Sequence, residues 1–305
     1  MIIKVLGSAA GGGFPQANCN CRNCADVRAG KPGLRRRTQS SLAVSPDGLR
    51  WVLLNASPDL RQQIEATPAL APRGGEGLRS SPIAGVVLTN GDVDHVAGLL
   101  SLREGFRFSL YASERVCAAL AANPIFNVLD SSRVPRLALA FDRSTEVTAG
   151  LEIEAFAVPG KIALYMEDQA AGPSVGTEAG DTLGLRVSDP ARGAAFFYIP
   201  GCAAVNAALA ARLSGAALVL FDGTLYTDDE LIAQGLSTKT GTRMGHISMA
   251  GPEGSIAAFG PLDVKRRIYV HMNNSNPVLR EGSPERATVE VAGWEIAWDG
   301  MEIRL

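Results

Sequence analysis

Two kinds of apolar pattern alternate along the chain. Short runs rich in β-branched residues are typical of buried strands, whereas longer stretches with apolar residues three or four positions apart are typical of helices. The predicted strands cover residues 2–6, 41–44, 51–54, 83–88, 196–199, 217–221 and 268–270. The predicted helices cover residues 60–66, 114–122 and 205–213.

The connections between these elements change along the chain. The early strands are joined by short turns such as Pro46-Asp47-Gly48, and the later strands alternate with helices. This mixture predicts an α/β (α+β) architecture of two sheets flanked by helices. With 305 residues, 46% of them hydrophobic, the chain can bury a large core. We expect one domain over residues 1–305.

Two loop segments interrupt the pattern. Residues 71–82 are rich in Pro, Gly, Ser and Arg, which predicts an exposed insertion loop. Residues 167–180 are polar and glycine-rich. Their composition fits a flexible lid or a solvated loop, and the solvated loop is the simpler interpretation.

Two of the three histidines follow predicted strands. His95 comes after residues 83–88 within Asn90-Gly-Asp-Val-Asp-His95, and His271 directly follows residues 268–270. Active sites of layered α/β proteins lie at such carboxyl ends of strands. A helix is predicted to begin here, with Asp94 at or near its N-cap. Two histidines and one carboxylate can hold a divalent metal on one face and leave the opposite face open. The alternative is a capping Asp94 and two hydrogen-bonded loop histidines.

Three of the five cysteines stand close together, as Cys19, Cys21 and Cys24. A disulfide framework would distribute cysteines in pairs, so a reducing compartment and a thiolate cluster that binds zinc fit better. A tetrahedral zinc needs a fourth ligand. His246, the Asn273-Asn274 pair or water could supply it, and three thiols without metal remain the alternative.

Charge and hydropathy narrow the function classes. A net charge of -2 offers no general attraction to phosphate backbones, which argues against a nucleic-acid binder. No apolar run approaches the roughly 20 residues that span a bilayer. From the sequence we expect a soluble, unprocessed, cytoplasmic protein, and a homodimer is left open.

These features resemble the metallo-β-lactamase superfamily, whose first motif is His-x-His-x-Asp-His. Further segments resemble the pyrroloquinoline quinone (PQQ) biosynthesis family within it, over nearly the whole chain except about residues 71–81. They are the Gly-rich start at residues 1–16, the cysteine loop, Thr38-Gln-Ser-Ser41, Asn55-Ala-Ser-Pro-Asp59, Met244-Gly-His246 and His271-Met-Asn-Asn-Ser-Asn-Pro277. The resemblance implies a four-layer αββα sandwich.

The departures from the superfamily pattern carry information. Asn90 and Asp92 occupy the first two histidine positions of the motif, Gly160 or Lys161 falls where the second-motif histidine is expected, and Gly201 replaces the bridging aspartate. The first metal site is therefore expected to be lost. Asp94, His95 and His271 match the ligands of the second site.

The resemblance implies an iron-dependent oxygenase. Fe(II) would be held by Asp94, His95 and His271, and O2 would be used to hydroxylate the tyrosine-derived ring of a Glu-Tyr precursor excised from the peptide PqqA. Asp92 is expected to act as a supporting base or weak extra ligand. Asp222 is a further supporting candidate, with an ordinary loop carboxylate as the simpler interpretation.

The resemblance also bears on the zinc site. Related phosphodiesterases complete a Cys-x-Cys-x-x-Cys zinc site with a histidine three residues after the terminal active-site histidine. That position is Asn274 here, so structural zinc is expected at Cys19, Cys21 and Cys24, apart from the reaction centre, with Asn274 or water as fourth partner.

Two other functions remain open at this point. A hydrolase would use Zn(II) and a metal-activated water at the same three residues, and a carrier would bind PQQ or its precursor without turnover. The three ligands accept Zn(II), Fe(II) and Cu(II), so the sequence does not choose between them.

Overall fold

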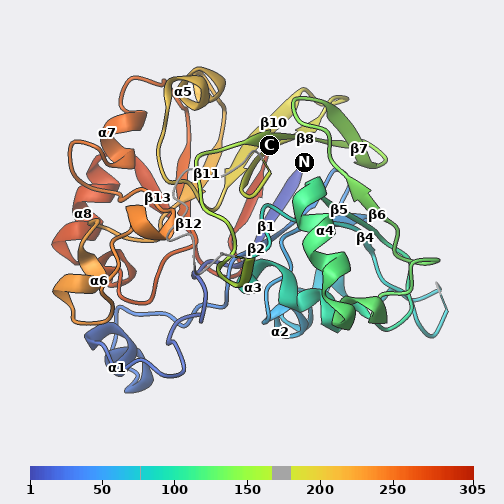
Figure 1. Ribbon diagram of the computed structural model, residues 1–305, viewed down its shortest axis with the longest axis horizontal. Helices are drawn as coiled ribbons and strands as arrows, with labels where there is room; N and C mark the ends of the chain where they lie inside the picture. The colour runs from blue at the N-terminus through green and yellow to red at the C-terminus, as the bar shows by residue number, and fades with distance from the viewer. Residues whose placement is uncertain (76, 167–179) are drawn as a thin grey trace.

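The computed structural model describes residues 1–75, 77–166 and 180–305. Two mixed β-sheets pack face to face, and helices cover the outer face of each (Figure 1). This is the four-layer αββα arrangement that the sequence predicts. The insertion loop within residues 71–82 is largely exposed where it is described, with Leu78 fully exposed. Of the predicted loop at 167–180, all but Gly180 lies outside the described residues.

The first sheet contains the amino-terminal strands and the last strand. In the described part of the chain its order is β14-β1-β2-β3-β4-β5-β6. The bounds are β14 Glu302–Arg304, β1 Ile2–Gly7, β2 Ser41–Ser45, β3 Trp51–Leu54, β4 Ile83–Val87, β5 Ser109–Ala112 and β6 Arg136–Ala138. Strands β3 to β6 run parallel, so their carboxyl ends share one edge.

The second sheet is built from the rest of the described strands. Its order is β13-β12-β11-β10-β9-β8-β7. The bounds are β13 Trp294–Ile296, β12 Arg267–Val270, β11 Val219–Asp222, β10 Ala194–Ile199, β9 Leu183–Asp189, β8 Leu151–Ala157 and β7 Ser144–Thr148. Strands β10 to β13 run parallel, and β12 ends directly before His271.

Helices divide between the two outer faces. Figure 1 places α2 and α4 beside the first sheet and α5 to α8 beside the second. The α-helices are α1 Arg22–Arg28, α2 Leu60–Glu65, α3 Val93–Val96, α4 Glu114–Ala122, α5 Ala207–Leu213, α6 Glu230–Ala233, α7 Ser255–Phe259 and α8 Pro284–Val291. The 3-10 helices are η1 Pro68–Leu70, η2 Ala97–Leu102, η3 Pro124–Val128, η4 Leu164–Met166, η5 Thr242–Met244 and η6 Pro277–Leu279.

An apolar core fills each of the three interfaces between the four layers. Strand β3 shows why, because its side chains alternate between the two faces of the sheet. Val52 and Leu54 join the core between the sheets, whereas Trp51 and Leu53 join the core beneath the helices of the first sheet. A strand covered on both faces must be apolar throughout, and this is the pattern that made β3 readable from the sequence.

The structure adds strands that the apolar runs did not mark, and β7 and β8 illustrate two reasons. In β8, Leu151, Ile153 and Ala155 are buried and alternate with partly exposed glutamates, a two-residue period that was readable in the sequence. Strand β7 is mostly polar and owes its conformation to antiparallel pairing with β8. Pairing over distance therefore overrides local propensity.

The helix predicted after β4 is shorter than its apolar spacing suggested. Helix α3 covers only Val93–Val96, and the 3-10 helix η2 replaces the α-helix at Ala97. Its N-cap is Asp92, and Asp94 lies in the first turn, so the expected capping position of Asp94 is off by two residues. Gly98 explains the tight packing here, because a Cβ at this position would come within 2.0 Å of the Ser57 carbonyl oxygen.

Candidate metal centre

Asp94, His95 and His271 meet between the two sheets. Asp94 and His95 lie on α3, just past the carboxyl end of β4, and His271 follows β12. His271 Nε2 lies 3.1 Å from Asp94 Oδ2, and His95 Nε2 lies 3.8 Å from the same oxygen. One ligand atom from each of the three residues lies within 4.8 Å of the others. The separation of 177 positions between Asp94 and His271 is thus closed by the packing of the sheets.

Asn90 orients the imidazole of His95. The Asn90 side-chain oxygen is 2.6 Å from His95 Nδ1 and also accepts a hydrogen bond from the Asp92 backbone N–H. An amide oxygen can only accept, so His95 Nδ1 carries the proton and Nε2 keeps its lone pair. His95 Nε2 is buried and has no hydrogen-bond partner among the described residues. An unpartnered buried imidazole nitrogen that faces a carboxylate fits a metal ligand.

A buried network holds His271 from its other side. Thr224 Oγ1 lies 2.9 Å from His271 Nδ1 and 2.6 Å from Asp222 Oδ1, so the hydroxyl accepts from the histidine and donates to the carboxylate. Nε2 of His271 therefore points to Asp94 Oδ2 across 3.1 Å, and a metal that binds between them takes the place of the proton that they share. His271 also has a left-handed φ of 58°, which costs free energy in a residue with a Cβ and is found at functional sites.

Asp222 and His246 form a pair beside this network. His246 Nδ1 donates to Asp222 Oδ2 over 2.7 Å, and the rings of His246 and His271 stack with centroids 5.3 Å apart. Asp222 is fully buried. Burial acts to raise its pKa, but the charge and hydrogen bond of His246, with help from His271 and Thr224, hold this pKa below its ordinary value. Asp222 is therefore an ionised orienting group, and not the ordinary loop carboxylate of the simpler interpretation.

The protonation of His95 and Asp94 suits metal binding, whereas burial acts to lower the pKa of His271 but the hydrogen bond and charge of Asp94 raise it, so a metal must displace a proton there. Burial lowers the pKa of His95 to about 4, which leaves this imidazole neutral at ordinary pH. Burial alone would raise the pKa of Asp94, yet the charges of His95 and His271 and the hydrogen bond from His271 hold it well below its usual range. A neutral imidazole and an ionised carboxylate are the forms that coordinate metals.

The residues at the positions of the lost first metal site lie beside the same centre. A cavity of about 600 Å3 is lined by the three residues above and by Asn90, Asp92, Lys161, Gly201 and His246, among others. Neither Asp92 nor Lys161 belongs to a group of three metal-ligating side chains in the described chain. Between the two positions considered for the second-motif histidine, Lys161 is the one that lines the cavity. Asp92 lies beside the centre, as a supporting role requires.

Cys19, Cys21 and Cys24 converge at the start of α1. Their sulfur atoms lie within 4.8 Å of one another, and Cys21 is the N-cap of α1 while Cys24 lies inside it. The cysteine segment is therefore partly helical, not one irregular loop. Burial raises the pKa of Cys24 to about 11, so a metal that binds here must displace its proton.

Asn274 covers the three sulfur atoms. Its side-chain nitrogen lies 3.1 Å from Cys19 Sγ, 3.6 Å from Cys21 Sγ and 3.3 Å from Cys24 Sγ. A half-turn of the amide would bring its oxygen to the same place, so Asn274 fits either as a donor to thiolates or as a fourth ligand. The alternative His246 lies against Asp222 instead. Asn273, the neighbour of Asn274 in the chain, lines the 600 Å3 cavity, whereas none of the three cysteines does.

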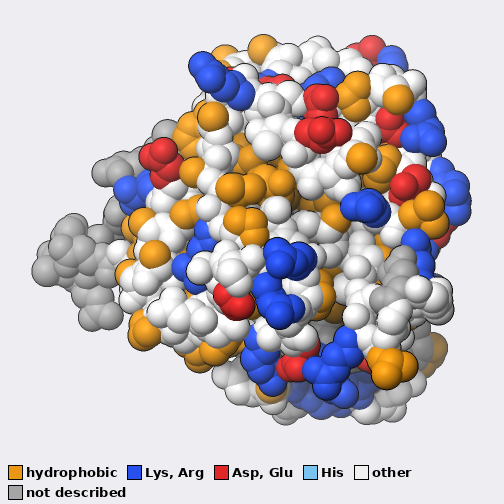
Figure 2. Space-filling view, turned by 90° about the vertical axis from the view of Figure 1, so that its right-hand side faces the viewer, with side chains coloured by type: hydrophobic (Ala, Val, Ile, Leu, Met, Phe, Trp, Pro, Cys, Tyr) orange, Lys and Arg blue, Asp and Glu red, His pale blue; other side chains and the backbone are white. Residues whose placement is uncertain are grey.

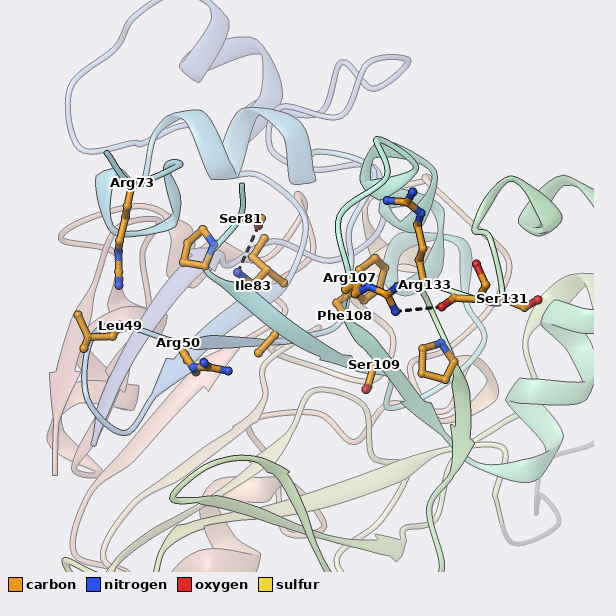
Figure 3. A pocket seen from close by; sticks show the side chains of 14 residues that line it. Leu49, Arg50, Arg73, Ser81, Ile83, Arg107, Phe108, Ser109, Ser131 and Arg133 are labelled. Carbon is orange, nitrogen blue, oxygen red and sulfur yellow. Dashed lines mark hydrogen bonds between the residues drawn. The ribbon is translucent and has the colours of Figure 1, made fainter. Parts of the chain in front are cut away.

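A second cavity lies at the opposite, amino ends of β4 and β5. Its volume is about 760 Å3, and Figure 3 shows its wall, which carries Arg50, Arg73, Arg107 and Arg133. Arg107 and Arg73 donate to backbone carbonyl oxygens. None of the described residues in this wall is a histidine, cysteine or carboxylate, so this cavity lacks metal ligands.

Sequence reasoning missed Thr224 and underrated Asn90 and His246. The sequence did contain a signal for His246, because it is one of only three histidines in the chain. It also contained one for Asp222, which lies at the carboxyl end of β11 just as His271 follows the carboxyl end of β12. No local signal marks Thr224, whose role depends on residues 2, 22 and 47 positions away.

The buried carboxyl group of Glu230 should make the stability of the protein depend on pH. Burial raises its pKa to about 7, although hydrogen bonds from Ser275 and the Tyr226 backbone act to lower it. The folded protein keeps this proton at pH values where the unfolded chain has lost it, so stability should fall as pH rises from about 4.5 to 7. We expect Glu230→Gln to remove this decline. The free energy of unfolding of the variant minus that of the parent should therefore be higher at pH 8 than at pH 5, by roughly 2 kcal/mol.

Chemical denaturation at pH 5 and pH 8 measures this difference. Glu253→Gln is the matched control, because Glu253 is exposed and should respond equally at both values. Equal stability differences for the two variants at both pH values would contradict the raised pKa of Glu230.

Known proteins match this chain in both sequence and fold. Residues 50–272 match the family model of the Beta-lactamase superfamily domain. The chain is 55% identical to a coenzyme PQQ synthesis protein B from Xanthomonas euvesicatoria pv. vesicatoria and 52% identical to one from Methylorubrum extorquens, with all of each chain covered. None of the helices in the described residues is long and apolar enough to cross a membrane.

Solved structures agree with these sequence matches. The crystal structure of Zn2+-bound PqqB from Methylobacterium extorquens is 51% identical, covers all of both chains and superimposes with a TM-score of 0.96. A diphosphatase of the PhnP family, 20% identical over 100% of this chain and 97% of its own, shares the fold with a TM-score of 0.68. The chain therefore belongs to the coenzyme PQQ synthesis protein B family of the β-lactamase superfamily.

Proposed function

We propose that this protein acts in PQQ biosynthesis as a non-haem Fe(II)-dependent hydroxylase that uses O2. Its substrate is the tyrosine-derived ring of the Glu-Tyr precursor derived from PqqA. The observation that carries the proposal is the convergence of Asp94, His95 and His271 on one open cavity, while Asn90 and Asp92 stand in place of the first-site histidines. One carboxylate and two imidazoles suit Fe(II) with coordination positions left open.

The residues around the centre have distinct roles in this proposal. Bound Fe(II) would supply the one-electron and dioxygen chemistry that side chains lack. Asn90 and Thr224 orient the two imidazoles. His246 uses Nδ1 to bind Asp222, so its Nε2 can hold or release a proton at the cavity wall. This supports a role for His246 in proton transfer to or from the ring hydroxyl.

The reaction has a defined balance. One oxygen atom of O2 enters the ring, and the other is reduced to water with two electrons and two protons. Reduction of O2 takes four electrons in all: the ring gives up two when it is hydroxylated, and an external reductant must supply the other two. Asp92 can take part in the proton supply, since burial and the neighbouring charge of Asp94 raise its pKa.

Mass spectrometry under 18O-labelled dioxygen tests the proposal. Protein reconstituted anaerobically with Fe(II) is given the precursor, ascorbate and then labelled O2, and a product with one 18O atom per added hydroxyl is expected. A zinc-loaded sample is the matched control and should give no oxygen incorporation. Label that enters from water in place of O2 would contradict the proposal.

A zinc hydrolase is the main rival, because the relative from Methylobacterium extorquens was crystallised with Zn2+. It predicts cleavage without oxygen by the zinc-loaded sample. A carrier of PQQ or its precursor predicts binding without turnover in both samples. The same experiment therefore separates the three functions.

We also propose a structural zinc at Cys19, Cys21 and Cys24 with Asn274 as fourth partner. The support is the mutual approach of three sulfurs beneath one buried amide. In this proposal the whole chain forms one domain in which the zinc stabilises the loop next to His271.

A further inference from the structure

Two lysines on the wall of the 600 Å3 cavity form no direct ion pair or side-chain hydrogen bond among the described residues, and the charge of Lys161 acts on Asp92 only from farther away. Lys161 and Lys239 both line this cavity. Within residues 1–75, 77–166 and 180–305, neither ammonium group forms an ion pair or a side-chain hydrogen bond. The three other lysines of the chain differ: Lys4, Lys31 and Lys265 each pair with a carboxylate. An ammonium group that is left unpaired beside a cavity is available to bind an anion.

Packing holds Lys161 toward the centre. Its backbone carbonyl accepts from Thr182 Oγ1 at the start of the second sheet. Its aliphatic stem lies against Gly245, where an added Cβ would come within 2.8 Å of Lys161 Cγ. Gly245 also has a left-handed φ of 83°, so this position favours glycine on two grounds. Lys161 is thereby placed next to His246 and near the vacated first-site positions.

The charges of the wall favour an anionic ligand. Of the described residues in the wall, two carboxylates, Asp92 and Asp94, balance the two ammonium groups. A divalent cation at Asp94, His95 and His271 would leave two positive charges uncompensated. A ligand with two negative charges would neutralise the cavity, whose partly buried wall makes electrostatic interactions stronger than in bulk water.

The remaining wall is suited to an aromatic ring. Val93 is 60% exposed although it is apolar, and Tyr165, Leu231 and Met244 line the same cavity. Binding sites for small molecules combine such apolar walls with a few placed charges, and 600 Å3 lies within their usual volume. The apolar and cationic parts of the wall therefore point to one molecule that has both features.

We propose that Lys161 and Lys239 form a carboxylate-binding subsite that holds a small aromatic dicarboxylate with its ring at the metal centre. The inference rests on the proposed function only for the chemistry at the ring. Lys161 supplies the inner contact and the more exposed Lys239 supplies the contact at the rim. In this arrangement the dismantled first metal site has become a substrate-binding site, with an ammonium in place of a metal charge.

Calorimetric titration of zinc-loaded protein with phenylsuccinate tests the subsite. Zinc has no redox chemistry, so binding is measured without turnover. We expect Lys161→Gln to weaken binding about tenfold, because it removes a charge-assisted contact that is only partly exposed. We expect Lys239→Gln to weaken binding about threefold, because its contact at the rim is largely exposed to water. Neutral phenylacetamide should bind weakly and equally to all variants, and added salt should weaken the dianion alone.

Matched variants make the result specific. Lys265→Gln removes a surface lysine that pairs with Asp263 and should bind phenylsuccinate like the parent protein. Lys161→Arg keeps the charge and should retain most of the affinity. Unchanged affinity in both Gln variants would mean that the metal alone holds the carboxylates, and it would overturn the subsite.

The outcomes for the two proposals are separable. Lysine-dependent binding without 18O incorporation would retain the subsite and reject the hydroxylase. Incorporation of 18O with an unchanged KM for the precursor in both Gln variants would retain the hydroxylase and reject the subsite. Unaltered thermal unfolding of the variants is expected, since neither lysine pairs with a described residue.

The face of the molecule shown in Figure 2 is not this subsite. Lys and Arg side chains predominate over its lower half. Surface cations of that kind meet bulk water, where their attraction for a small anion is weak and screened by salt. The lysines of the cavity differ because they lie beside two partly buried carboxylates and three imidazoles.

Discussion

Replacement of His271 with Ala should abolish metal binding at the centre and all activity that depends on it. Of the residues that converge there, only Asp94 and His95 would remain as ligands. Loss of a supporting residue alone typically costs 10- to 100-fold in metal affinity, so loss of a ligand should cost more than about a hundredfold. Metal content after dialysis and 18O incorporation, measured on the same sample, check this result.

Two further variants serve as comparisons: one removes a different ligand, and the other removes a residue beside the centre that is not a ligand. His271 itself already has the left-handed φ of 58°, so its replacement with Ala, which also has a Cβ, adds little backbone strain. His95→Ala removes a ligand from an ordinary helical position and should lose metal equally. Asp92→Ala should retain the metal and show a smaller loss of activity. Full iron content and activity in the His271→Ala protein would reject the three-residue centre.

Replacement of Cys21 with Ser should release the structural zinc and destabilise the fold. Zinc bound by thiolates contributes its binding free energy to folding. Removing one of three thiolates should cost about 3 to 5 kcal/mol, which lowers the unfolding temperature of a chain of this size by about 5–15 °C. Zinc content by atomic absorption and thermal unfolding with and without added zinc give the two readouts.

A cysteine outside the cluster is the appropriate control. Cys117 lies on α4, far along the chain and packed against the core beneath the first sheet, and Cys117→Ser should keep the full zinc content. Protein of the Cys21→Ser variant that remains folded should keep most of its chemistry, since the thiols are not part of the wall of the 600 Å3 cavity. Unchanged zinc in this variant would reject the cluster as a metal site.

The sequence by itself was sufficient for the features that depend on neighbouring residues. Trp51–Leu54 and Glu114–Ala122 were predicted with the observed bounds, because apolar periodicity is a local property that burial on both faces or on one face imposes. The placement of His95 and His271 after strands was readable for the same reason. The clustering of Cys19, Cys21 and Cys24 was likewise predictable, because all three cysteines lie in one short segment.

Only the tertiary structure decided how the polar residues act. Asn90 could be read as a lost ligand, and the packed structure shows it as the group that orients His95. Thr224 carries no local signal, yet it links Asp222 to His271. Lys161 lines the cavity, and Gly245, at the end of η5 and 84 positions away along the chain, packs against its stem. The physical reason is that apolar burial follows from the pattern of one element, whereas a hydrogen bond or a metal ligand depends on partners that distant segments supply.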